Sequence, residues 1–217
     1  MLSKLQYISQ GLTKHEQLDN IKSVLDGGGE WIQLRFKNAD EKLLKETADE
    51  VMKMKAQYKF TFVVNDFPFV AKSVDADGVH LGLEDMQLLS ARNIVGDKKI
   101  IGGTANTIDH VIQRIAEGCN YIGLGPFRFT TTKEKLSPVL GIGGYQGILQ
   151  VLQENKHKTP VFAIGGVTIN DLPELVKAGV YGVAVSGLLT NEKDKVKIIE
   201  QINTILDGKV DYSRKGI

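Results

Sequence analysis

Three polar side chains alternate along residues 33–37, where they could bind an anion. Gln33, Arg35 and Lys37 are separated by apolar residues, and alternate residues of a strand project from the same face. An arginine and a lysine on one face suit an anionic group, most naturally a phosphate, because both donate charge-assisted hydrogen bonds. A polar rim in solvent is the alternative, and we favour the phosphate site.

Two carboxylates that follow apolar runs could hold a hard cation. Asp66 comes directly after Asn65 at the end of one run, and Asp85 follows the next. Carboxylate oxygens, completed by water and substrate phosphate, are the ligands that Mg²⁺ prefers. A helix cap at Asp66 and a solvated turn at Asp85 are the alternatives. We expect His80, between Val79 and Leu81, to be a packed, hydrogen-bonded residue and not a metal ligand, and no Cys/His cluster indicates zinc.

Three later segments could bind a second anion. Glycines or small polar residues occur in two of them, Gly165-Gly166 and Ser186-Gly187, where the backbone can approach a ligand closely. The third segment is a polar loop that suits an active-site lid, with an ordinary surface loop as the alternative. Its candidate residues are Thr130, Thr131, Thr132 and Lys133. Two anion sites predict two phosphate-bearing substrates.

These residues must be positioned by alternating strands and helices. Short, continuously apolar runs are typical of parallel strands covered on both faces. They predict eight strands, at 5–9, 31–36, 61–66, 78–82, 99–104, 121–126, 160–166 and 182–187. The clearest helical patterns between and after them cover 40–58, 107–117, 170–178 and 192–206, and the interval 67–74 leaves room for only a short helix.

The alternation predicts an α/β fold with a single (β/α)8 TIM barrel over residues 1–217. An open, doubly wound sheet is the alternative. In such barrels the chemistry lies at the carboxyl ends of the strands, where the polar clusters fall. Within 107–117, we expect a threonine cap and one apolar face made of Ile108, Val111, Ile112 and Ile115.

Composition excludes several classes of function. The formal net charge of +1 gives no electrostatic signal for nucleic acid or a membrane surface. The single cysteine, Cys119, fits a reducing compartment, and no apolar run has membrane-spanning length. We therefore expect a cytoplasmic protein with small-molecule substrates. The sequence leaves a homo-oligomer open.

Seven motifs, taken in order, resemble the thiamine phosphate synthase family. Each motif alone is weak, but together they cover nearly the whole chain and fall at predicted strand ends. They are Q-L-R-F-K (33–37), N-D (65–66), A-D-G-V-H-L-G-L-E-D (76–85), G-G-T-A-N-T (102–107), G-L-G-P-F-R-F-T-T-T-K (123–133), A-I-G-G-V (163–167) and G-V-A-V-S-G (182–187).

The resemblance implies a Mg²⁺-dependent transferase. The nitrogen of a thiazole phosphate would displace diphosphate from hydroxymethylpyrimidine diphosphate, giving thiamine phosphate and diphosphate. In that family the C–O bond breaks early and the thiazole traps a pyrimidine carbocation. Such a step needs stabilisation of the departing diphosphate more than it needs a general base.

The resemblance also implies residue roles by position in the motifs. Catalysis would rest on Arg35, Lys37, Thr104 and Lys133, and the metal would be held by Asp66 and Asp85. The pyrimidine diphosphate would contact Gln33, Arg35, Lys37, Asn65, Thr104 and Lys133, and the thiazole phosphate would contact Thr130, Thr131, Thr132, Gly165, Gly166, Val185 and Ser186. The chain departs from the commoner pattern at Leu83, Asn106 and Arg128, without losing a charge that the mechanism needs.

Three other functions compete with this prediction. A thiazole tautomerase shares the barrel but needs a general acid or base, which its family places near Asn106. An aldolase would need a desolvated lysine, whereas Lys37 lies beside Arg35 and Lys133 lies in a very polar loop. A catalytically silent relative would bind a thiamine precursor, but the diphosphate and metal residues are retained.

Overall fold

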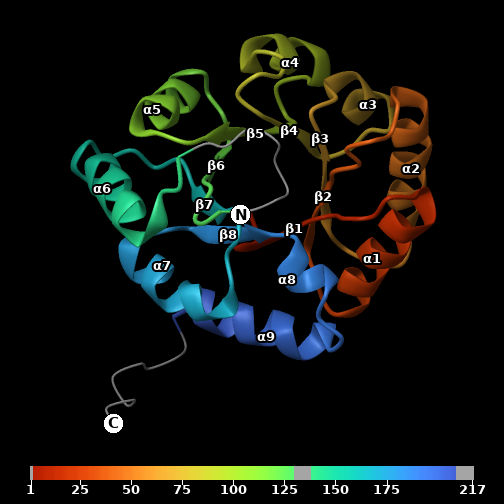
Figure 1. Ribbon diagram of the computed structural model, residues 1–217. Coiled ribbons are helices and arrows are strands. Elements are labelled where there is room, and N and C mark those ends of the chain that lie inside the picture. The colour runs from red at the N-terminus through yellow and green to blue at the C-terminus, as the bar shows by residue number, and fades with distance from the viewer. Residues whose placement is uncertain (1, 130–137, 209–217) are drawn as a thin grey trace.

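Eight parallel strands close into a barrel in the computed structural model (Figure 1), which describes residues 2–129 and 138–208. The strands pair in chain order, and β1 also pairs with β8, which excludes the open sheet and confirms the closed barrel. They are β1 (Leu5–Ile8), β2 (Trp31–Leu34), β3 (Thr61–Asn65), β4 (Gly78–Leu81), β5 (Ile100–Ala105), β6 (Tyr121–Leu124), β7 (Val161–Ile164) and β8 (Gly182–Val185).

Helices surround the barrel on all sides (Figure 1). They are α1 (Lys14–Asp26), α2 (Glu41–Met54), α3 (Pro68–Ser73), α4 (Leu88–Val95), α5 (Ile108–Ala116), α6 (Gly141–Glu154), the 3₁₀ helix η1 (Ile169–Asp171), α7 (Leu172–Ala178), α8 (Gly187–Thr190) and α9 (Lys195–Leu206). Within the described ranges, no helix is both long enough and apolar enough to cross a membrane.

The predicted boundaries were too wide in several places. Strands expected to reach 126, 166 and 187 end at Leu124, Ile164 and Val185, and after β7 the left-handed Gly165 and Gly166 (φ 85° and 73°) turn the chain out of the sheet. Residues 186 and 187 instead begin the short helix α8. The helix predicted at 170–178 consists of η1 followed by α7, and it ends as expected at Gly179, which has a left-handed conformation (φ 98°).

One end of the barrel is closed by aromatic rings. Trp31, Tyr121 and Phe162 lie at or next to the first residues of β2, β6 and β7, and all three are buried. The Trp31 ring packs edge to face on Tyr121 and Phe162, with centroid distances of 4.8 and 5.1 Å. This amino-terminal end of the barrel is therefore filled by side chains.

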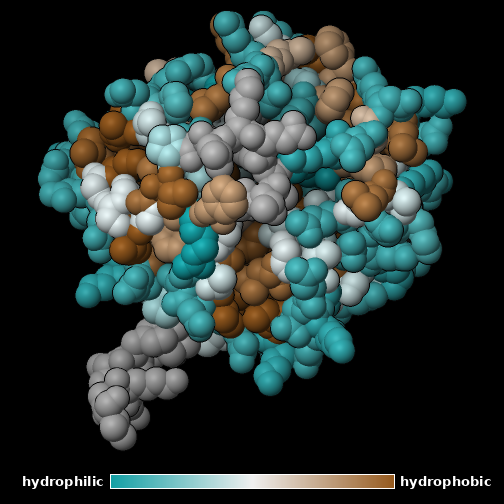
Figure 2. Space-filling view, in the orientation of Figure 1, coloured by the Kyte–Doolittle hydropathy of each residue, from teal (hydrophilic) through white to brown (hydrophobic). Residues whose placement is uncertain are grey.

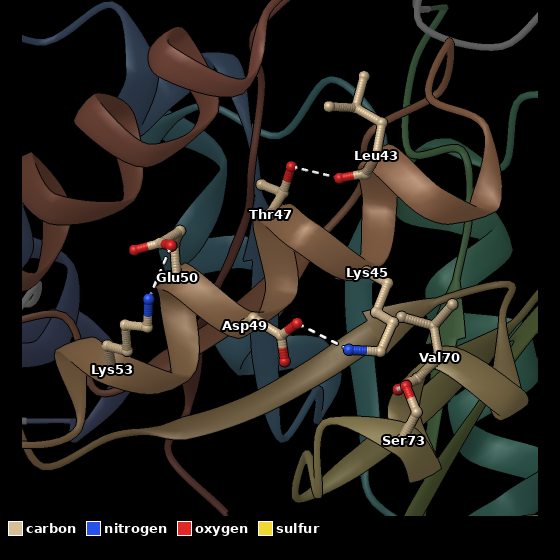
Figure 3. A network of polar contacts seen from close by, with 8 residues as sticks. All are labelled: Leu43, Lys45, Thr47, Asp49, Glu50, Lys53, Val70 and Ser73. Atoms are coloured by element: carbon tan, nitrogen blue, oxygen red, sulfur yellow. Dashed lines mark hydrogen bonds and ion pairs between the residues drawn. The ribbon is translucent and has the colours of Figure 1, made fainter.

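Helix α2 shows how the outer helices are held. Asp40 caps it, since its side chain accepts a hydrogen bond from the backbone N–H of Leu43. Two exposed ion pairs, Lys45–Asp49 and Lys53–Glu50, span successive turns at 2.8 Å each (Figure 3). Such exposed pairs stabilise little, so the helix is held chiefly by the buried face formed by Leu44, Thr47, Ala48 and Val51.

The predicted apolar face of α5 was wrong in part. Thr107 caps the helix as expected and Val111 is buried, but Ile112 is 39 % exposed. Arg114 is buried instead, because its guanidinium donates to the carbonyls of Thr104 (3.1 Å) and Gly82 (2.9 Å). The helix therefore turns an arginine toward the strand ends, where buried backbone oxygens need a donor.

Candidate active site

Two cavities adjoin at the carboxyl end of the barrel. Cavity 1 has a volume of about 510 Å³ and cavity 2 of about 470 Å³, and Ile8, Arg35 and Ile164 line both. In the orientation of Figure 1, hydrophobic residues gather in a hollow near the centre of this face, beside the position of α8 (Figure 2). The shared wall makes the two cavities compartments of one site.

Cavity 1 is lined by the residues predicted to bind the diphosphate and the metal. The predicted diphosphate and metal residues within the described ranges all line it, namely Gln33, Arg35, Lys37, Asn65, Asp66, Asp85 and Thr104. His80, Gly82, Leu83, Glu84 and Asn106 line it as well. The carboxyl ends of β2, β3, β4 and β5 meet here, which is why residues distant in the sequence share one wall.

Arg35 occupies the partition between the cavities and is fixed through its backbone. Its N–H donates to Ser9 Oγ (3.0 Å), and its carbonyl accepts from Gln17 Nε2 (3.2 Å). Burial lowers the pKa of the Arg35 guanidinium, while Asp66 and Asp85 act to raise it. Both carboxylates are therefore within electrostatic range of a cation that faces the two cavities.

Asp66 follows β3 in a left-handed conformation (φ 66°), which aspartate tolerates better than most residues. Its N–H donates to the carbonyl of His80 at 2.8 Å, so the neighbouring strand β4 fixes its backbone. The alternative of a helix cap at Asp66 is wrong, because α3 begins after Phe67 and has no side-chain cap. The carboxylate instead lines cavity 1.

Asp85 lies in a solvated turn, which was the alternative, and it also lines the cavity where the metal is predicted. It is exposed, and its Oδ2 accepts a hydrogen bond from the backbone N–H of Gly82 at 2.6 Å, which closes the turn after β4. It also lines cavity 1 with Asp66. Among the residues that the structure describes, no group of three or more His, Cys, Asp or Glu converges. Two carboxylates beside the cationic side chains of Arg35 and Lys37 resemble the sites that usually hold Mg²⁺, in which one or two protein carboxylates act together with substrate phosphates.

The floor of cavity 1 is neutral and buried. Gln33, Thr104, His80 and Asn106 are exposed by only 2, 4, 6 and 5 %, whereas Lys37 and Asp85 on the rim are exposed. Gln33 Nε2 has no hydrogen-bond partner within the described part of the chain. A buried donor without a partner costs free energy. A ligand acceptor atom would satisfy it.

His80 is packed and hydrogen-bonded, as expected. Its Nδ1 lies 2.9 Å from the Tyr121 hydroxyl, and its Nε2 lies 3.0 Å from Thr104 Oγ1. Gln6 Nε2 donates to the same Tyr121 hydroxyl at 3.1 Å. Sequence reasoning missed Tyr121 and Gln6, because it treated both as parts of apolar strands. The polar atom of each, at an otherwise apolar strand position, is the signal that could have identified them.

Cavity 2 collects the part of the second predicted group that the structure describes. Gly165 and Gly166 line it with φ of 85° and 73°, which the short loop after β7 requires, and Val185 and Ser186 line it from the end of β8. Ser186 Oγ donates to the carbonyl of Ile8 at 2.6 Å, so the hydroxyl fixes the wall. Sequence reasoning missed the other polar lining residues, Ser9, Gln10, Thr168 and Asn191. Thr130, Thr131, Thr132 and Lys133 lie outside the described residues.

The loops after β6 and β7 are joined beside cavity 2. The N–H groups of Phe127 and Arg128 donate to the carbonyls of Ile164 (2.8 Å) and Gly165 (3.1 Å). The Asn106 amide also donates to the carbonyl of Gly125, so it is engaged by the backbone after β6. The arrangement can hold one anion beside the carboxylates of cavity 1 and a second at the glycine loop of cavity 2.

Comparison with known proteins gives concordant results. Residues 6–189 match the family model described as thiamine monophosphate synthase. The chain is 52 % identical over 203 residues to the thiamine-phosphate synthase of Flavobacterium psychrophilum, covering 94 % of this chain and 98 % of that one. It is 50 % identical over 210 residues to that of Flavobacterium johnsoniae, with coverage of 97 and 99 %. A thiamine phosphate pyrophosphorylase structure from Pyrococcus furiosus superposes with a TM-score of 0.81 at 30 % identity, covering 96 and 97 %.

Proposed function

This chain belongs to the thiamine monophosphate synthase family, and on that premise we propose that it joins hydroxymethylpyrimidine diphosphate to a thiazole phosphate. The thiazole nitrogen forms a bond to the pyrimidine methylene carbon, the C–O bond to diphosphate breaks, and diphosphate leaves with the electron pair. The products are thiamine phosphate and diphosphate. One observation carries the proposal, which is that two cavities of similar volume share Arg35.

The pyrimidine diphosphate belongs in cavity 1. Its uncharged ring fits the neutral, buried floor, where Gln33 Nε2 supplies an unused donor. Its diphosphate fits the rim, where Arg35, Lys37 and Asn65 present cationic and amide groups. Thr104 reaches the ring from the end of β5. The ring is thus shielded from water, while the anionic leaving group points toward cations.

The thiazole phosphate belongs in cavity 2. Gly165 and Gly166 let the backbone approach a phosphate closely, and Val185 and Ser186 form the opposite wall. By their position in the motif at 123–133, we also assign the thiazole phosphate to Thr130, Thr131 and Thr132. We assign a contact with the diphosphate to Lys133. Because the cavities share a wall, the nucleophile and the reacting carbon meet beside Arg35 and Ile164.

Asp66 and Asp85 are the residues that would hold Mg²⁺. They line the same cavity as the proposed diphosphate site, and Arg35 interacts electrostatically with both. When bound, the ion would neutralise charge on the departing diphosphate. The chain's own part is to stabilise that charge through Arg35 and Lys37 and to keep the ring dry on the neutral floor.

The geometry disfavours the competing functions. The position where a tautomerase would carry an acid or base is Asn106, whose amide is bonded to the backbone of Gly125. An aldolase needs a desolvated lysine, but Lys37, the lysine that lines cavity 1 among the described residues, is exposed. A silent relative would have no need of the paired carboxylates. We propose that one domain carries both compartments, because all eight strands close on one barrel.

The test is a discontinuous assay with hydroxymethylpyrimidine diphosphate, thiazole phosphate and Mg²⁺, followed for thiamine phosphate and diphosphate. We expect one diphosphate for each thiamine phosphate, with product formation lost in EDTA and restored by excess Mg²⁺. Absence of product with intact binding of thiazole phosphate would contradict the proposal and favour a tautomerase or a silent relative.

A further inference from the structure

The floor of cavity 1 rests on a buried chain of hydrogen bonds. It runs from Gln6 Nε2 to the Tyr121 hydroxyl (3.1 Å), from that hydroxyl to His80 Nδ1 (2.9 Å), and from His80 Nε2 to Thr104 Oγ1 (3.0 Å). All four side chains are at most 6 % exposed. Thr104 and His80 line the cavity, whereas Gln6 and Tyr121 lie beneath it. Gln6 and Tyr121 therefore act on the cavity indirectly, and these hydrogen bonds run through His80 and Thr104.

The packing around Tyr121 leaves its hydroxyl little freedom. Its ring lies edge to face against Trp31 and Phe162. A Cβ atom on Gly102 would lie 2.2 Å from Tyr121 Cζ, so the absence of a side chain at 102 makes room for the phenol. The hydroxyl is thus held in place between Gln6 and His80 by rings on two sides and by a backbone on a third.

The donors and acceptors in this series of hydrogen bonds have a preferred order. Burial raises the pKa of Tyr121 well above its usual value, so the phenol keeps its proton. The hydroxyl accepts from Gln6, and its own hydrogen is then available to His80 Nδ1. The nearby Gln33 amide acts to lower that pKa, although its Nε2 has no hydrogen-bond partner among the described residues.

A neutral imidazole that accepts at Nδ1 carries its hydrogen at Nε2. His80 therefore donates to Thr104 Oγ1, and the hydrogen of the Thr104 hydroxyl is left over. We propose that Gln6, Tyr121 and His80 are positioning residues that fix the Nε2–H tautomer of His80 and turn the Thr104 hydroxyl hydrogen into cavity 1. Its acceptor is a lone pair on the uncharged ring of the substrate, a step that rests on the proposed function.

The choice of a neutral acceptor follows from the charges around the site. The floor residues Gln33, Thr104 and Asn106 carry no formal charge, while Arg35 and Lys37 stand nearer the rim. A phosphate would sit better against those cations than against hydroxyl and amide groups alone. The Thr104 hydroxyl, with its hydrogen directed into the cavity, would instead select a substrate ring that carries a hydrogen-bond acceptor opposite it.

The first arm of the test needs no variant and no turnover. Long-range ¹H–¹⁵N spectra of the unliganded protein report the tautomer of each imidazole, and His80→Gln identifies the His80 signals among the four histidines. We expect the Nε2–H tautomer. The Nδ1–H tautomer or a doubly protonated ring would overturn the proposal. Since this arm does not use the reaction, it distinguishes a wrong relay from a wrong function.

The second arm is kinetic. Tyr121→Phe keeps the ring but removes the hydroxyl, and we expect kcat/KM for hydroxymethylpyrimidine diphosphate to fall about tenfold, as for one lost hydrogen bond. KM for thiazole phosphate should not change. The matched control is Tyr181→Phe, which removes a hydroxyl bonded to the Leu2 carbonyl at 2.8 Å, away from the cavity. Equal losses in both variants would overturn the relay.

Two further comparisons separate positioning from simple packing. In a Thr104→Val background, Tyr121→Phe should have no additional effect on kcat/KM, because the relay acts through the missing hydroxyl. Replacement of His80 by Gln should retain more activity than replacement by Asn, since a Gln amide reaches the place of Nε2 and an Asn amide only that of Nδ1. Additive losses in the double variant, or Asn equal to Gln, would contradict the proposal. If no turnover occurs, affinity for hydroxymethylpyrimidine diphosphate by calorimetry replaces kcat/KM.

Discussion

Arg128 and Asp171 are joined by two hydrogen bonds, from Nη1 to Oδ2 at 2.8 Å and from Nη2 to Oδ1 at 2.7 Å. Arg128 Nη1 also donates to the carbonyl of Gly166 (3.0 Å), and Asp171 Oδ2 accepts from the N–H of Thr168 (2.7 Å). The pair thus fastens the loop after β6 to the loop after β7, at the residues that line cavity 2.

We predict that Arg128→Ala weakens use of the thiazole phosphate. Loss of the bidentate contact frees the loop at Gly166 and Thr168, so KM for thiazole phosphate should rise about fivefold, roughly 1 kcal/mol for a pair whose arginine is partly exposed. KM for the pyrimidine substrate should stay within about twofold. Steady-state kinetics with each substrate varied in turn gives both values. The control Lys45→Ala breaks an exposed pair on α2, and a similar change in both KM values would refute the assignment.

The same pair should contribute equally across ordinary pH. Burial acts to raise the Asp171 pKa, but hydrogen bonds from Arg128 and Thr168 outweigh it and hold the pKa below the usual value of an aspartate. Stability from Asp171 is thus present above that value and is lost as pH falls through the folded pKa. The Arg128 pKa is raised by Asp171, so its share is lost only at extreme alkaline pH.

The urea unfolding free energy of the wild type minus that of Arg128→Ala should therefore be constant from about pH 5 to about pH 9. A difference that changes within this range would show that another titrating group governs the contact.

We predict that Asp66→Asn removes Mg²⁺-dependent turnover but keeps the fold. Asparagine tolerates the left-handed backbone at this position (φ 66°), whereas alanine would add strain. The rate at saturating substrates should fall by about a hundredfold or more, with Mg²⁺ affinity reduced in calorimetry. Asp49→Asn on the outer face of α2 serves as the control (Figure 3). Full activity in Asp66→Asn would remove Asp66 from the metal site.

We predict opposite effects on stability from two alanine substitutions at glycines. At Gly102 the new Cβ would lie 2.2 Å from Tyr121 Cζ, so Gly102→Ala should cost about 1–3 kcal/mol. At Gly147, inside α6, no atom lies within 4 Å of the new Cβ, and the change should stabilise by up to about 1 kcal/mol. Urea unfolding measures both, and a neutral Gly102→Ala would mean that Tyr121 is less tightly packed than the structure shows.

We predict that the native protein does not react with thiol reagents. Burial raises the pKa of Cys119 to about 12, so at pH 8 only about one molecule in ten thousand carries a thiolate. Absorbance of a chromogenic disulfide reagent should show no rapid release from the folded chain and one equivalent in urea. Rapid labelling of the folded protein at this residue would mean that the connection between α5 and β6, which contains Cys119, opens readily.

The sequence by itself determined the barrel and most of the candidate site. Continuous apolar runs identify parallel strands, because both faces of such strands are buried. Polar residues placed just after those runs identify the carboxyl end of the barrel, which is how Arg35, Asp66 and Gly165 were found. These features are local in the chain, because each depends only on a few neighbouring residues, so they can be recognised without the tertiary structure.

Only the tertiary structure decided which of these residues share a cavity and what supports them. Local periodicity predicted Ile112 on the buried face of α5, but carbonyls of distant strands draw Arg114 there instead. In the sequence Tyr121 resembles an ordinary strand residue, and only the closed barrel shows that its hydroxyl contacts Gln6 and His80. Hydrogen bonds between residues far apart in sequence depend on the ring of eight strands, so no local pattern of residues contains them.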